Sequence, residues 1–312
     1  MRYAIIMAAG KGTRMHSTLP KVMHKVCDKP MIEHLVDTLS HADVQRVVSI
    51  VGYGHEVIED YMKGKCEFAL QMPQLGTGHA VMQAKQLEGL KGKTLVVNGD
   101  CPCIKEETFE RMFDALDDAK MVVLCAKLDD PKAYGRVVTN DDGTIEKIVE
   151  FKDCNEQQKN IKYINTGIYA FDNEVLFENL KELKNDNNQH EYYITDLVEI
   201  IRNKGHKVKA IVADDNDEVQ GINDKVELAK ANEYLQREIN TKWMKLGVNI
   251  VDPKCTYISS DVEIGEDVVI YPNVIISGKS KIGNSVIIKA NSIIENSTIE
   301  DGQIVGPFAN IK

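Results

Sequence analysis

Two cationic side chains beside a glycine-rich turn are the first residues of this sequence that could do chemistry. Residues 8–14 read Ala-Ala-Gly-Lys-Gly-Thr-Arg, and Pro20-Lys21 follow shortly afterwards. Small residues let backbone N–H groups approach phosphate oxygens, and the start of a following helix favours anions. Arg14 would add a forked charge and Lys21 a point charge. The segment therefore indicates a phosphate-binding loop, with a solvated turn as the alternative.

The spacing within this loop differs from two common phosphate-binding motifs. The pattern G-x-x-x-x-G-K-[ST] is absent, and Met15 occupies the third glycine position of G-x-G-x-x-G. The loop follows an apolar run at residues 3–7, which predicts a strand. Open α/β sheets bind ligands at the carboxyl ends of their strands, so the loop stands where a ligand is expected.

A second polar segment lies at residues 71–80, between a predicted strand and a predicted helix. The Gln71 amide offers one donor and one acceptor edge to a nucleobase. Gly76, Thr77 and Gly78 permit close backbone approach, and a flexible loop with a threonine cap is the alternative. His79 is assigned no catalytic role, because phosphoryl transfer depends on positioning more than on proton transfer.

Asp100 and Asn223 are the candidate metal ligands. Asp100 follows the apolar run 94–98, where a metal-binding carboxylate is expected, although a turn aspartate also fits. Asn223 precedes a long predicted helix and could supply a second oxygen. An N-cap role for Asn223 is physically just as good, and the sequence does not decide between the two.

Alternating short apolar runs and amphipathic stretches predict the elements that must position these residues. The expected strands are 3–7, 46–51, 67–71, 94–98 and 121–126, and the expected helices are 31–39, 78–86 and 107–116. This βαβα order indicates an α/β domain with a mostly parallel, Rossmann-like sheet. Further along we expect a hairpin at 136–139 and 144–150, strands at 163–171 and 208–213, and helices at 195–203 and 224–246.

The last part of the chain repeats every six residues. Isoleucine stands at positions 258, 264, 270, 276, 282, 288 and 294, and Ile293, Ile299, Val305 and Ile311 continue the period after a one-residue shift. Neither a helix nor a lone strand has a period of six, whereas a β-solenoid does. We therefore expect three parts: a catalytic domain at 1–223, a linker helix at 224–246 and an incomplete β-helix at 247–312.

Composition narrows the function classes. The net charge of −10 argues against a nucleic-acid-binding surface, and no apolar run is long enough for a membrane span. Seven cysteines without a secretion signal predict cytosolic thiols, and hence a cytoplasmic protein. Cys101 and Cys103 have no second pair at metal-site spacing, so buried apolar thiols are favoured over zinc.

Taken together, these motifs resemble the bacterial bifunctional N-acetylglucosamine-1-phosphate uridylyltransferase/glucosamine-1-phosphate acetyltransferases. The resemblance covers essentially the whole chain. It rests on Gly-x-Gly-Thr-Arg-Met with Pro20-Lys21, and on Gln71, Leu75–Ala80, Gly99-Asp100, Tyr134-Gly135-Arg136, Ile148–Glu150, Asn165–Gly167, Glu191–Tyr193, Thr195-Asp196 and Glu218–Asn223, followed by the hexapeptide repeat.

The resemblance implies a role for each site residue. Catalysis would fall to Arg14, Lys21 and Asp100. The uridine nucleotide would be held by Met7, Ala8, Ala9, Gly10, Lys21, Gln71, Gly76 and Thr77. The N-acetylglucosamine pocket would be lined by Gly135, Glu150, Asn165 and Thr166. Asp100 and Asn223 would hold Mg²⁺. The implied reaction is UMP transfer from UTP to N-acetylglucosamine 1-phosphate, with release of pyrophosphate.

The resemblance also implies a left-handed parallel β-helix and a homotrimer. The repeat ends within a hexad at Lys312, so the chain is expected to be cut short, to lack acetyltransferase activity and to trimerise more weakly. One rival is a nucleotidyltransferase for another base or sugar, such as thymidylyl transfer to glucose 1-phosphate. The other is a hexapeptide acyltransferase or trimeric scaffold, which is disfavoured because no histidine follows His206 to act as a base.

Overall fold

Two compact units make up the chain. The computed structural model describes residues 1–132, 134–140, 142–149, 151–187 and 189–312. The first unit comprises Met1–Met23 and Met31–Asp224, and the second comprises His24–Pro30 and Lys225–Lys312. The units separate one residue after the expected end of the catalytic domain. Residues 24–30 and the long helix belong to the second unit, a grouping that the predicted three-part division did not include.

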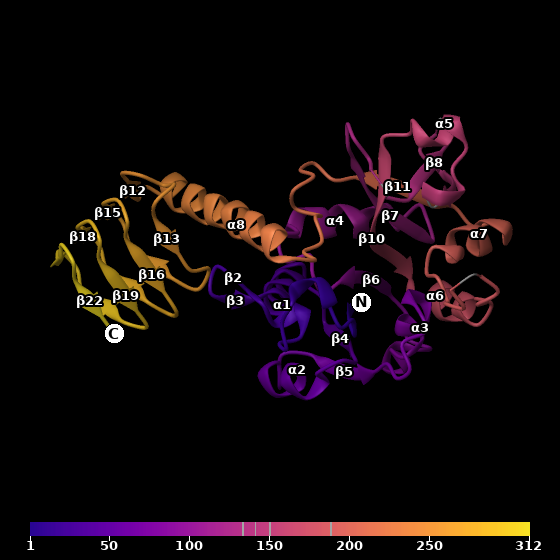
Figure 1. Ribbon diagram of the computed structural model, residues 1–312, viewed down its shortest axis with the longest axis horizontal. Coiled ribbons are helices and arrows are strands. Elements are labelled where there is room, and N and C mark those ends of the chain that lie inside the picture. The colour runs from indigo at the N-terminus through magenta and orange to yellow at the C-terminus, as the bar shows by residue number, and fades with distance from the viewer. Residues whose placement is uncertain (133, 141, 150, 188) are drawn as a thin grey trace. The chain divides into compact units, whose positions relative to one another are not determined.

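A mixed sheet forms the centre of the first unit (Figure 1). Its strands are β1 (Arg2–Ala8), β4 (Arg46–Val51), β5 (Glu67–Leu70), β6 (Lys93–Asn98), β7 (Met121–Lys127), β8 (Arg136–Thr139), β9 (Ile145–Val149), β10 (Tyr163–Asp172) and β11 (Val208–Val212). The main order is β11-β7-β10-β6-β1-β4-β5, and β8 pairs with both β9 and β10. Strand β10 runs antiparallel to β6 and β7, while β1, β4, β5 and β6 are parallel, as are β7 and β11. The predicted mostly parallel α/β sheet is confirmed.

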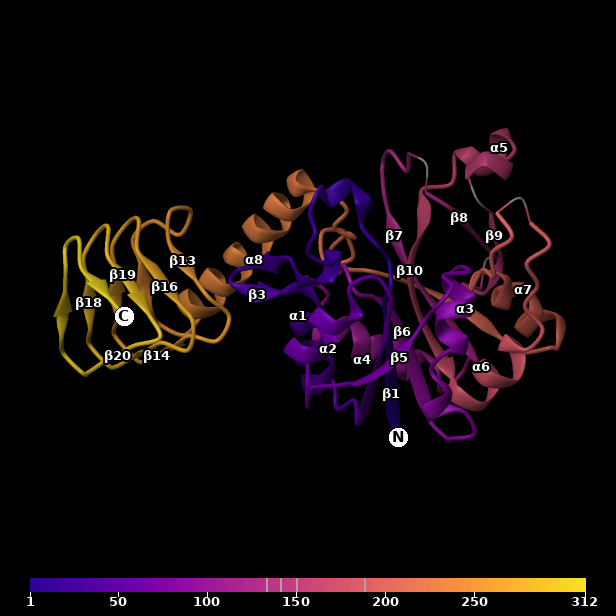
Figure 2. The ribbon, with the colours of Figure 1, turned by 60° about the horizontal axis from the view of Figure 1, so that its bottom comes forward.

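Helices cover both faces of this sheet, because successive side chains of a strand point to opposite sides. In β1, Ala4 and Ile6 pack with α1 (Met31–His41), α2 (His55–Tyr61) and α4 (Glu106–Ala115). Tyr3 and Ile5 pack on the other side, with α3 (Thr77–Met82), α6 (Asn173–Leu180) and α7 (Asp196–Asn203). Figure 2 shows the two groups of helices on either side of the strands.

Shorter elements complete the first unit. They are the 3₁₀ turns η1 (Thr13–Met15), η2 (Lys21–Met23), η3 (Lys85–Leu87) and η4 (Phe151–Asp153), and the one-turn helix α5 (Glu156–Lys159). The helix expected at 78–86 is divided into α3 and η3, because Ala84 leaves the helical conformation with ψ of 46°. Across the described residues, we find no helix with the length and apolar character that a membrane span requires.

The second unit begins with a hairpin and a long helix. Strands β2 (Lys25–Val26) and β3 (Lys29–Pro30) flank Cys27-Asp28, whose positive φ angles form the turn. Helix α8 (Lys225–Lys245) presents a buried Asn240, whose amide donates to the carbonyls of Pro253 and Thr256. These bonds tie the helix to the start of the solenoid.

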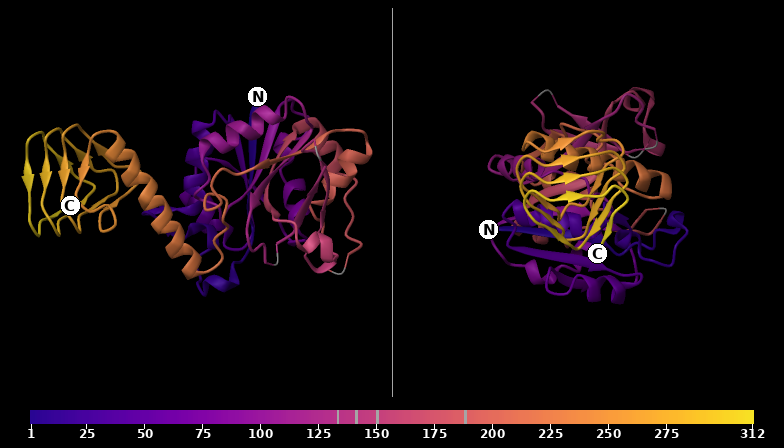
Figure 3. Two further views of the ribbon diagram at one scale, coloured as in Figure 1. Left: turned by 90° about the horizontal axis from the view of Figure 1, so that it is seen from above. Right: turned by 90° about the vertical axis from the view of Figure 1, so that its left-hand side faces the viewer.

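Short parallel strands stack on three faces of the solenoid (Figure 3). The first stack is β12 (Asn249–Ile250), β15 (Val269–Ile270), β18 (Ile287–Ile288) and β21 (Ile304–Val305). The second is β13 (Tyr257–Ile258), β16 (Ile275–Ser277), β19 (Ile293–Glu295) and β22 (Asn310–Ile311), and the third is β14 (Glu263–Ile264), β17 (Lys281–Ile282) and β20 (Thr298–Ile299). This arrangement confirms the predicted parallel β-helix, whose left-handed sense stays a prediction.

One detail of the hexad interpretation is wrong. Ile294 is buried in the solenoid core, whereas Ile293 is exposed and lies outside the inward-facing series. The inward series passes from Ile294 directly to Ile299, since the turn between β19 and β20 is one residue shorter than its counterpart between β16 and β17. Accordingly Lys281 pairs with Thr298, seventeen residues later, while Glu263 pairs with Lys281, eighteen residues later.

Candidate active site

The carboxyl ends of β1 and β6 form the edge of the sheet at which the strand order reverses. The chain builds β1, β4 and β5 in one direction and then returns to place β6 on the other side of β1. Met7 pairs with Asn98, and the Gly99 N–H donates to the Met7 carbonyl at 3.0 Å. The loops after β1 and β6 therefore leave the sheet side by side, where α/β sheets bind their ligands.

The glycine-rich loop is shaped to admit Lys21. Ala8 and Ala9 are buried at the end of β1, whereas Gly10 is exposed. Gly12 has a φ of +61°, and a Cβ on it would stand 2.6 Å from Lys21 Cβ. Any side chain at position 12 would thus displace the aliphatic part of Lys21, which packs against this turn.

Lys21 joins Asp100 to Asn223. Its ammonium forms an ion pair with Asp100 Oδ2 and donates to Asn223 Oδ1 at 2.8 Å. The side chains of Lys21 and Asp100 are 17% and 16% exposed, so the group lies in a recess that solvent still reaches. Three segments that are far apart in the sequence meet here, at the places where the sequence predicted a phosphate ligand and two metal ligands.

The segment that carries Asn223 is anchored on both sides. The buried carboxylate of Glu218 accepts bonds from the Lys105 N–H and the Thr108 hydroxyl at the start of α4, and burial raises its pKa. Further along, the Ile222 N–H donates to the Asp100 carbonyl at 3.0 Å. Helix α8 begins at Lys225, close after Asn223, so the two expected roles of Asn223, ligand and cap, both stay open.

The donor set of Asp100 and Asn223 fits a hard divalent cation. A carboxylate oxygen and an amide oxygen surround one positive charge, which Lys21 supplies in this structure. The described part of the chain contains no group of three or more His, Cys, Asp or Glu that could enclose a metal alone. Hard divalent cations are commonly held by one or two protein oxygens together with substrate phosphates and water, and Asp100 and Asn223 are two such oxygen donors.

Gln71 lies beneath the loop between β5 and α3. Its side chain is 3% exposed, and Nε2 donates to the Gly76 carbonyl at 3.0 Å. The same nitrogen lies 3.2 Å from His79 Nδ1, in position to donate to the neutral ring. Burial lowers the pKa of His79, which favours that neutral form.

The turn at Gly76 and Thr77 is held by a second segment. The hydroxyl of Thr77 accepts from the Ile194 N–H at 3.1 Å, and the Gly78 N–H donates to the Tyr192 carbonyl at 2.7 Å. Gly76 has a φ of +99°, and a Cβ there would stand 2.6 Å from that carbonyl. Both expected nucleotide residues therefore also shape the loop that presents Gln71.

Two expected sugar-binding segments meet beside β10. The Asn165 N–H donates to the Gly135 carbonyl at 3.0 Å. The Asn165 amide donates to the Tyr169 hydroxyl, and the Thr166 hydroxyl donates to the Leu124 carbonyl. The pairing of β10 with β7 is irregular between Asn165 and Tyr169, which frees this stretch from the regular ladder. Glu150, the fourth expected residue, lies outside the described residues.

Asn98, which stands at the end of β6 two residues before Asp100, contacts the Thr166 segment. Its amide donates to the Thr166 carbonyl at 3.3 Å and stands 2.6 Å from where a Cβ of Gly167 would be. The sequence interpretation drew nothing from Asn98, although a polar residue that ends an apolar strand two positions before Asp100 was an available signal. Arg14 is exposed and forms no ion pair within the described residues, so the structure does not bring it to the cluster.

Comparison with known proteins gives the chain its relatives. The nucleotidyl transferase family matches residues 3–249, and the bacterial transferase hexapeptide family, with six repeats, matches residues 261–296. The chain is 44% identical over its whole length to "Bifunctional protein GlmU" of Shouchella clausii, and 50% identical over 89% of its length to the protein of that name from Geobacillus thermodenitrificans. The chain spans 73% and 61% of those two relatives, respectively.

Solved structures show the same fold. A putative glucose-1-phosphate thymidylyltransferase from Bacillus anthracis, in complex with sucrose, superposes with a TM-score of 0.59 at 23% identity. It covers 74% of this chain and 94% of its own. HddC from Yersinia pseudotuberculosis superposes with a TM-score of 0.57 at 22% identity, and covers 75% of this chain and all of its own.

Proposed function

The chain belongs to the nucleotidyl transferase family, and we propose that it transfers UMP from UTP to N-acetylglucosamine 1-phosphate, releasing pyrophosphate. The observation that carries this proposal is the meeting of Lys21, Asp100 and Asn223 at the edge of the sheet. A single cationic side chain between two oxygen donors is suited to an anionic reaction centre, since charge placed there in advance stabilises a transferring phosphoryl group.

In this mechanism the protein positions groups and supplies charge. An oxygen of the sugar phosphate attacks the α-phosphorus of UTP in line, and pyrophosphate leaves without a covalent enzyme intermediate. Lys21 and the backbone N–H groups of residues 8–12 hold the triphosphate, and Arg14, being exposed, is available to bind it as it enters. Asp100 and Asn223 would hold Mg²⁺, which would neutralise negative charge on the phosphates when bound.

The selection of uracil is assigned to Gln71. The two N–H groups of its amide are directed at the Gly76 carbonyl and at His79 Nδ1. Its Oε1 has no protein partner within the described residues, so it can accept from the N3–H of uracil. Cytosine carries an acceptor at that position and would be repelled. Thymine carries the same N3–H group, so Gln71 does not separate UTP from dTTP.

The sugar subsite is assigned to Gly135, Asn165 and Thr166, with Glu150 contributing from outside the described residues. The bond from Asn165 to Gly135 and the contact of Thr166 with Asn98, two residues before Asp100, support this assignment. The contact with Asn98 suits a substrate whose sugar and phosphate bind side by side. The acetamido preference rests on the family resemblance alone.

The decisive experiment measures pyrophosphate release with Mg²⁺ and a panel of nucleotides and sugar phosphates. We expect release only when a nucleotide and a sugar phosphate are both present, with UTP and N-acetylglucosamine 1-phosphate as the best pair. Preference for dTTP and glucose 1-phosphate would replace the proposed substrates but keep the reaction class. The absence of release with every pair would refute nucleotidyl transfer by this chain.

The outward faces of the β-helix support the proposed homotrimer. On the second stack, Tyr257, Ile275 and Ile293 form an exposed apolar row in register. On the third stack, the equivalent row consists of Glu263, Lys281 and Thr298, which are polar. An apolar face beside a polar one is expected if one face packs against a second copy of the chain and the other faces water.

Variants that each change one outward face of the β-helix test whether the chain forms a trimer. Light scattering should give the mass of a trimer for the native chain and of a monomer for the double variant Ile275→Asp, Ile293→Asp. The control is Thr298→Asp, which places one negative charge on the polar face and should leave the mass unchanged. A native chain that is monomeric, or a double variant that stays trimeric, would contradict the assignment.

Two further properties follow as proposals. All seven cysteines are free in the structure, which favours the cytoplasm because thiols persist in a reducing compartment. No histidine follows His206, so these 312 residues contain no solenoid base for acetyl transfer, and we retain the prediction that they do not catalyse it.

A further inference from the structure

Arg136 is a buried arginine whose guanidinium meets backbone carbonyls instead of a carboxylate. It is 2% exposed, the largest of the fully buried side chains described. Its Nη2 donates to the Lys132 carbonyl at 3.0 Å, and its Nη1 donates to the Tyr134 carbonyl and more weakly to that of Pro131. Within the described part of the chain, no acidic side chain forms an ion pair with it. Burying a charge without an opposite charge beside it lowers the stability of the fold unless hydrogen bonds to the buried group offset the cost.

Those carbonyls belong to a turn that would be strained without the arginine. The Tyr134 N–H donates to the Pro131 carbonyl, which closes the turn. Lys132 has a φ of +44°, a left-handed conformation that a residue with a side chain adopts at a cost. Arg136 Nη2 bonds the carbonyl of that same residue. The guanidinium thus stabilises the turn at the position where the backbone is least favourable.

The turn leads directly into the proposed sugar subsite. Gly135 follows the turn, and its carbonyl accepts the Asn165 N–H. Arg136 itself pairs with Ile164 of β10, next to Asn165. On the other side, the guanidinium lies over the ring of Phe151, 5.1 Å from its centroid, at the start of η4. One residue therefore links the turn and η4 through its side chain and β10 through its backbone.

We propose that Arg136 is a positioning residue for the sugar phosphate: it holds Pro131, Lys132 and Tyr134 of the turn in place and thereby sets the KM for that substrate without touching it. The inference rests on the proposed function, because the sugar subsite is part of it. Among the described residues, no contact connects Arg136 to Gln71 or to the glycine-rich loop, so we expect the effect to be confined to the sugar phosphate.

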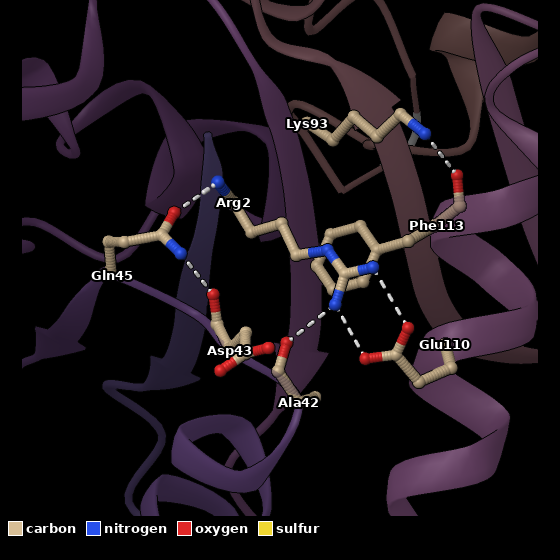
Figure 4. Close-up of polar contacts among 7 residues, drawn as sticks. All are labelled: Arg2, Ala42, Asp43, Gln45, Lys93, Glu110 and Phe113. Atoms are coloured by element: carbon tan, nitrogen blue, oxygen red, sulfur yellow. Dashed lines mark hydrogen bonds and ion pairs between the residues drawn. The ribbon is translucent and has the colours of Figure 1, made fainter.

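Arg2 provides a matched control (Figure 4). Its guanidinium lies over the ring of Phe113, 4.5 Å from the centroid, and donates to the Ala42 carbonyl at 2.9 Å. It also forms a forked pair with Glu110. Like Arg136, Arg2 lies over an aromatic ring and donates to a backbone carbonyl, but it also pairs with a carboxylate and its side chain is 26% exposed. It stands at the start of β1, at the opposite end of that strand from the glycine-rich loop.

The test compares Arg136→Lys with Arg2→Lys. Lysine keeps the charge but loses the planar fork and much of the stacking. We expect Arg136→Lys to raise the KM for the sugar phosphate about tenfold, equivalent to about 1.4 kcal/mol, and to leave the KM for UTP within twofold. Arg2→Lys should leave both unchanged. Equal KM values for Arg136→Lys and the native chain, or an equal rise for both substrates, would overturn the inference.

Hydrogen exchange gives a readout that does not depend on turnover. The amides of Lys132, Tyr134 and Gly135 should exchange faster in Arg136→Lys than in the native chain or in Arg2→Lys, and unchanged exchange would also refute the inference. If the best substrate is a different sugar phosphate, the proposed function fails, and the same KM comparison is made with that sugar phosphate. The two failures are therefore distinguishable.

Discussion

The two ends of strand β1 use the same chemical groups in opposite ways. At its start, Arg2 forms a fork to Glu110 and donates to the Ala42 carbonyl, and Lys93 donates to the Phe113 carbonyl (Figure 4). Lys93 also pairs with Asp117. At its end, Lys21 meets Asp100 and Asn223 in a recess, among loops rich in glycine and alanine.

This difference shows what separates a structural cluster from a binding site. At the start of β1, the acceptors match the donors and helix α4 packs over them, so little capacity is left for a ligand. At the end of β1, small residues leave space and the cation holds two oxygen donors that a metal could take instead. Stability is concentrated at one end, and the capacity to bind charge at the other.

The first prediction compares the effect on kcat of removing one carboxylate charge at each end of the sheet, where we expect the largest difference. Asp100→Asn removes the charge beside Lys21, and we expect kcat to fall at least about a hundredfold, as for loss of a preorganised electrostatic contact. The control is Asp172→Asn at the other end of the sheet. It breaks the 2.7 Å ion pair with Lys120, yet asparagine can still cap α6 as Asp172 does.

Pyrophosphate release measures both variants, and their melting temperatures show that each is folded. Asp172→Asn should retain native turnover within about twofold, because its ion pair is half exposed and worth little. Similar losses in the two variants would mean that the ends of the sheet do not differ in the way described.

The second prediction compares two glycines, Gly12 in the loop after β1 and Gly89 in the loop before β6. Gly12→Ala should lower kcat about tenfold, because its Cβ would collide with Lys21 and shift the ammonium. Gly89, in the loop before β6, has a φ of +76° and no atom within 4 Å of its would-be Cβ. Gly89→Ala therefore carries the same backbone strain, about 1–2 kcal/mol, without a collision. Steady-state kinetics of the pair separate displacement of Lys21 from strain, and equal kcat values would exclude the collision as a cause.

The third prediction concerns pH and the base-binding loop. Burial lowers the pKa of His79 below its usual value of about 6.5, so the folded state favours the neutral ring. The stabilisation is present above pH 6.5 and is lost as the pH falls through the lower folded pKa, because the unfolded state binds the proton first. Protonation of Nδ1 would also end its bond with Gln71. We expect the KM for UTP to rise about threefold in this range.

The terminal phosphate of UTP gains a proton in a similar pH range. A variant must therefore separate protonation of His79 from protonation of the substrate. His79→Asn keeps an acceptor near the position of Nδ1 and does not titrate. The rise in KM at low pH should be smaller in His79→Asn than in the native chain, and identical pH profiles would assign the effect to the substrate.

The fold was predictable where burial is periodic. The strand at residues 46–51 and the strand at residues 136–139 match β4 and β8 in both bounds, and the six-residue period identified the β-helix. Helices α2 and α6 were not predicted, although Asp172 is an N-cap signal for α6. Local patterns also did not show that residues 24–30 pack with the second unit, since such packing joins distant parts of the chain.

The residues of the candidate site could be proposed from the sequence more readily than the contacts that join them. Lys21, Asp100 and Asn223 were each chosen from segment type and resemblance, and they meet in the structure. The linking roles of Asn98 and Arg136 were not foreseen, because both depend on backbone carbonyls that only folding brings within reach. The main-chain carbonyls that these two side chains contact leave no side-chain pattern in the sequence.

The smallest expected effect on catalysis is that of Arg2→Lys, which completes the comparison. Lysine cannot form the fork to Glu110 and reaches the Ala42 carbonyl less well, so we expect a loss of about 1–2 kcal/mol in the free energy of unfolding. The unfolding midpoint should fall by roughly 2–8 °C, while kcat and both KM values stay within twofold. A change in kcat would show that the start of β1 is coupled to the site through the strand itself. Unchanged kinetics with lower stability would mean that the same side chain chemistry serves packing at one end of the strand and substrate binding at the other, and that the surroundings decide which.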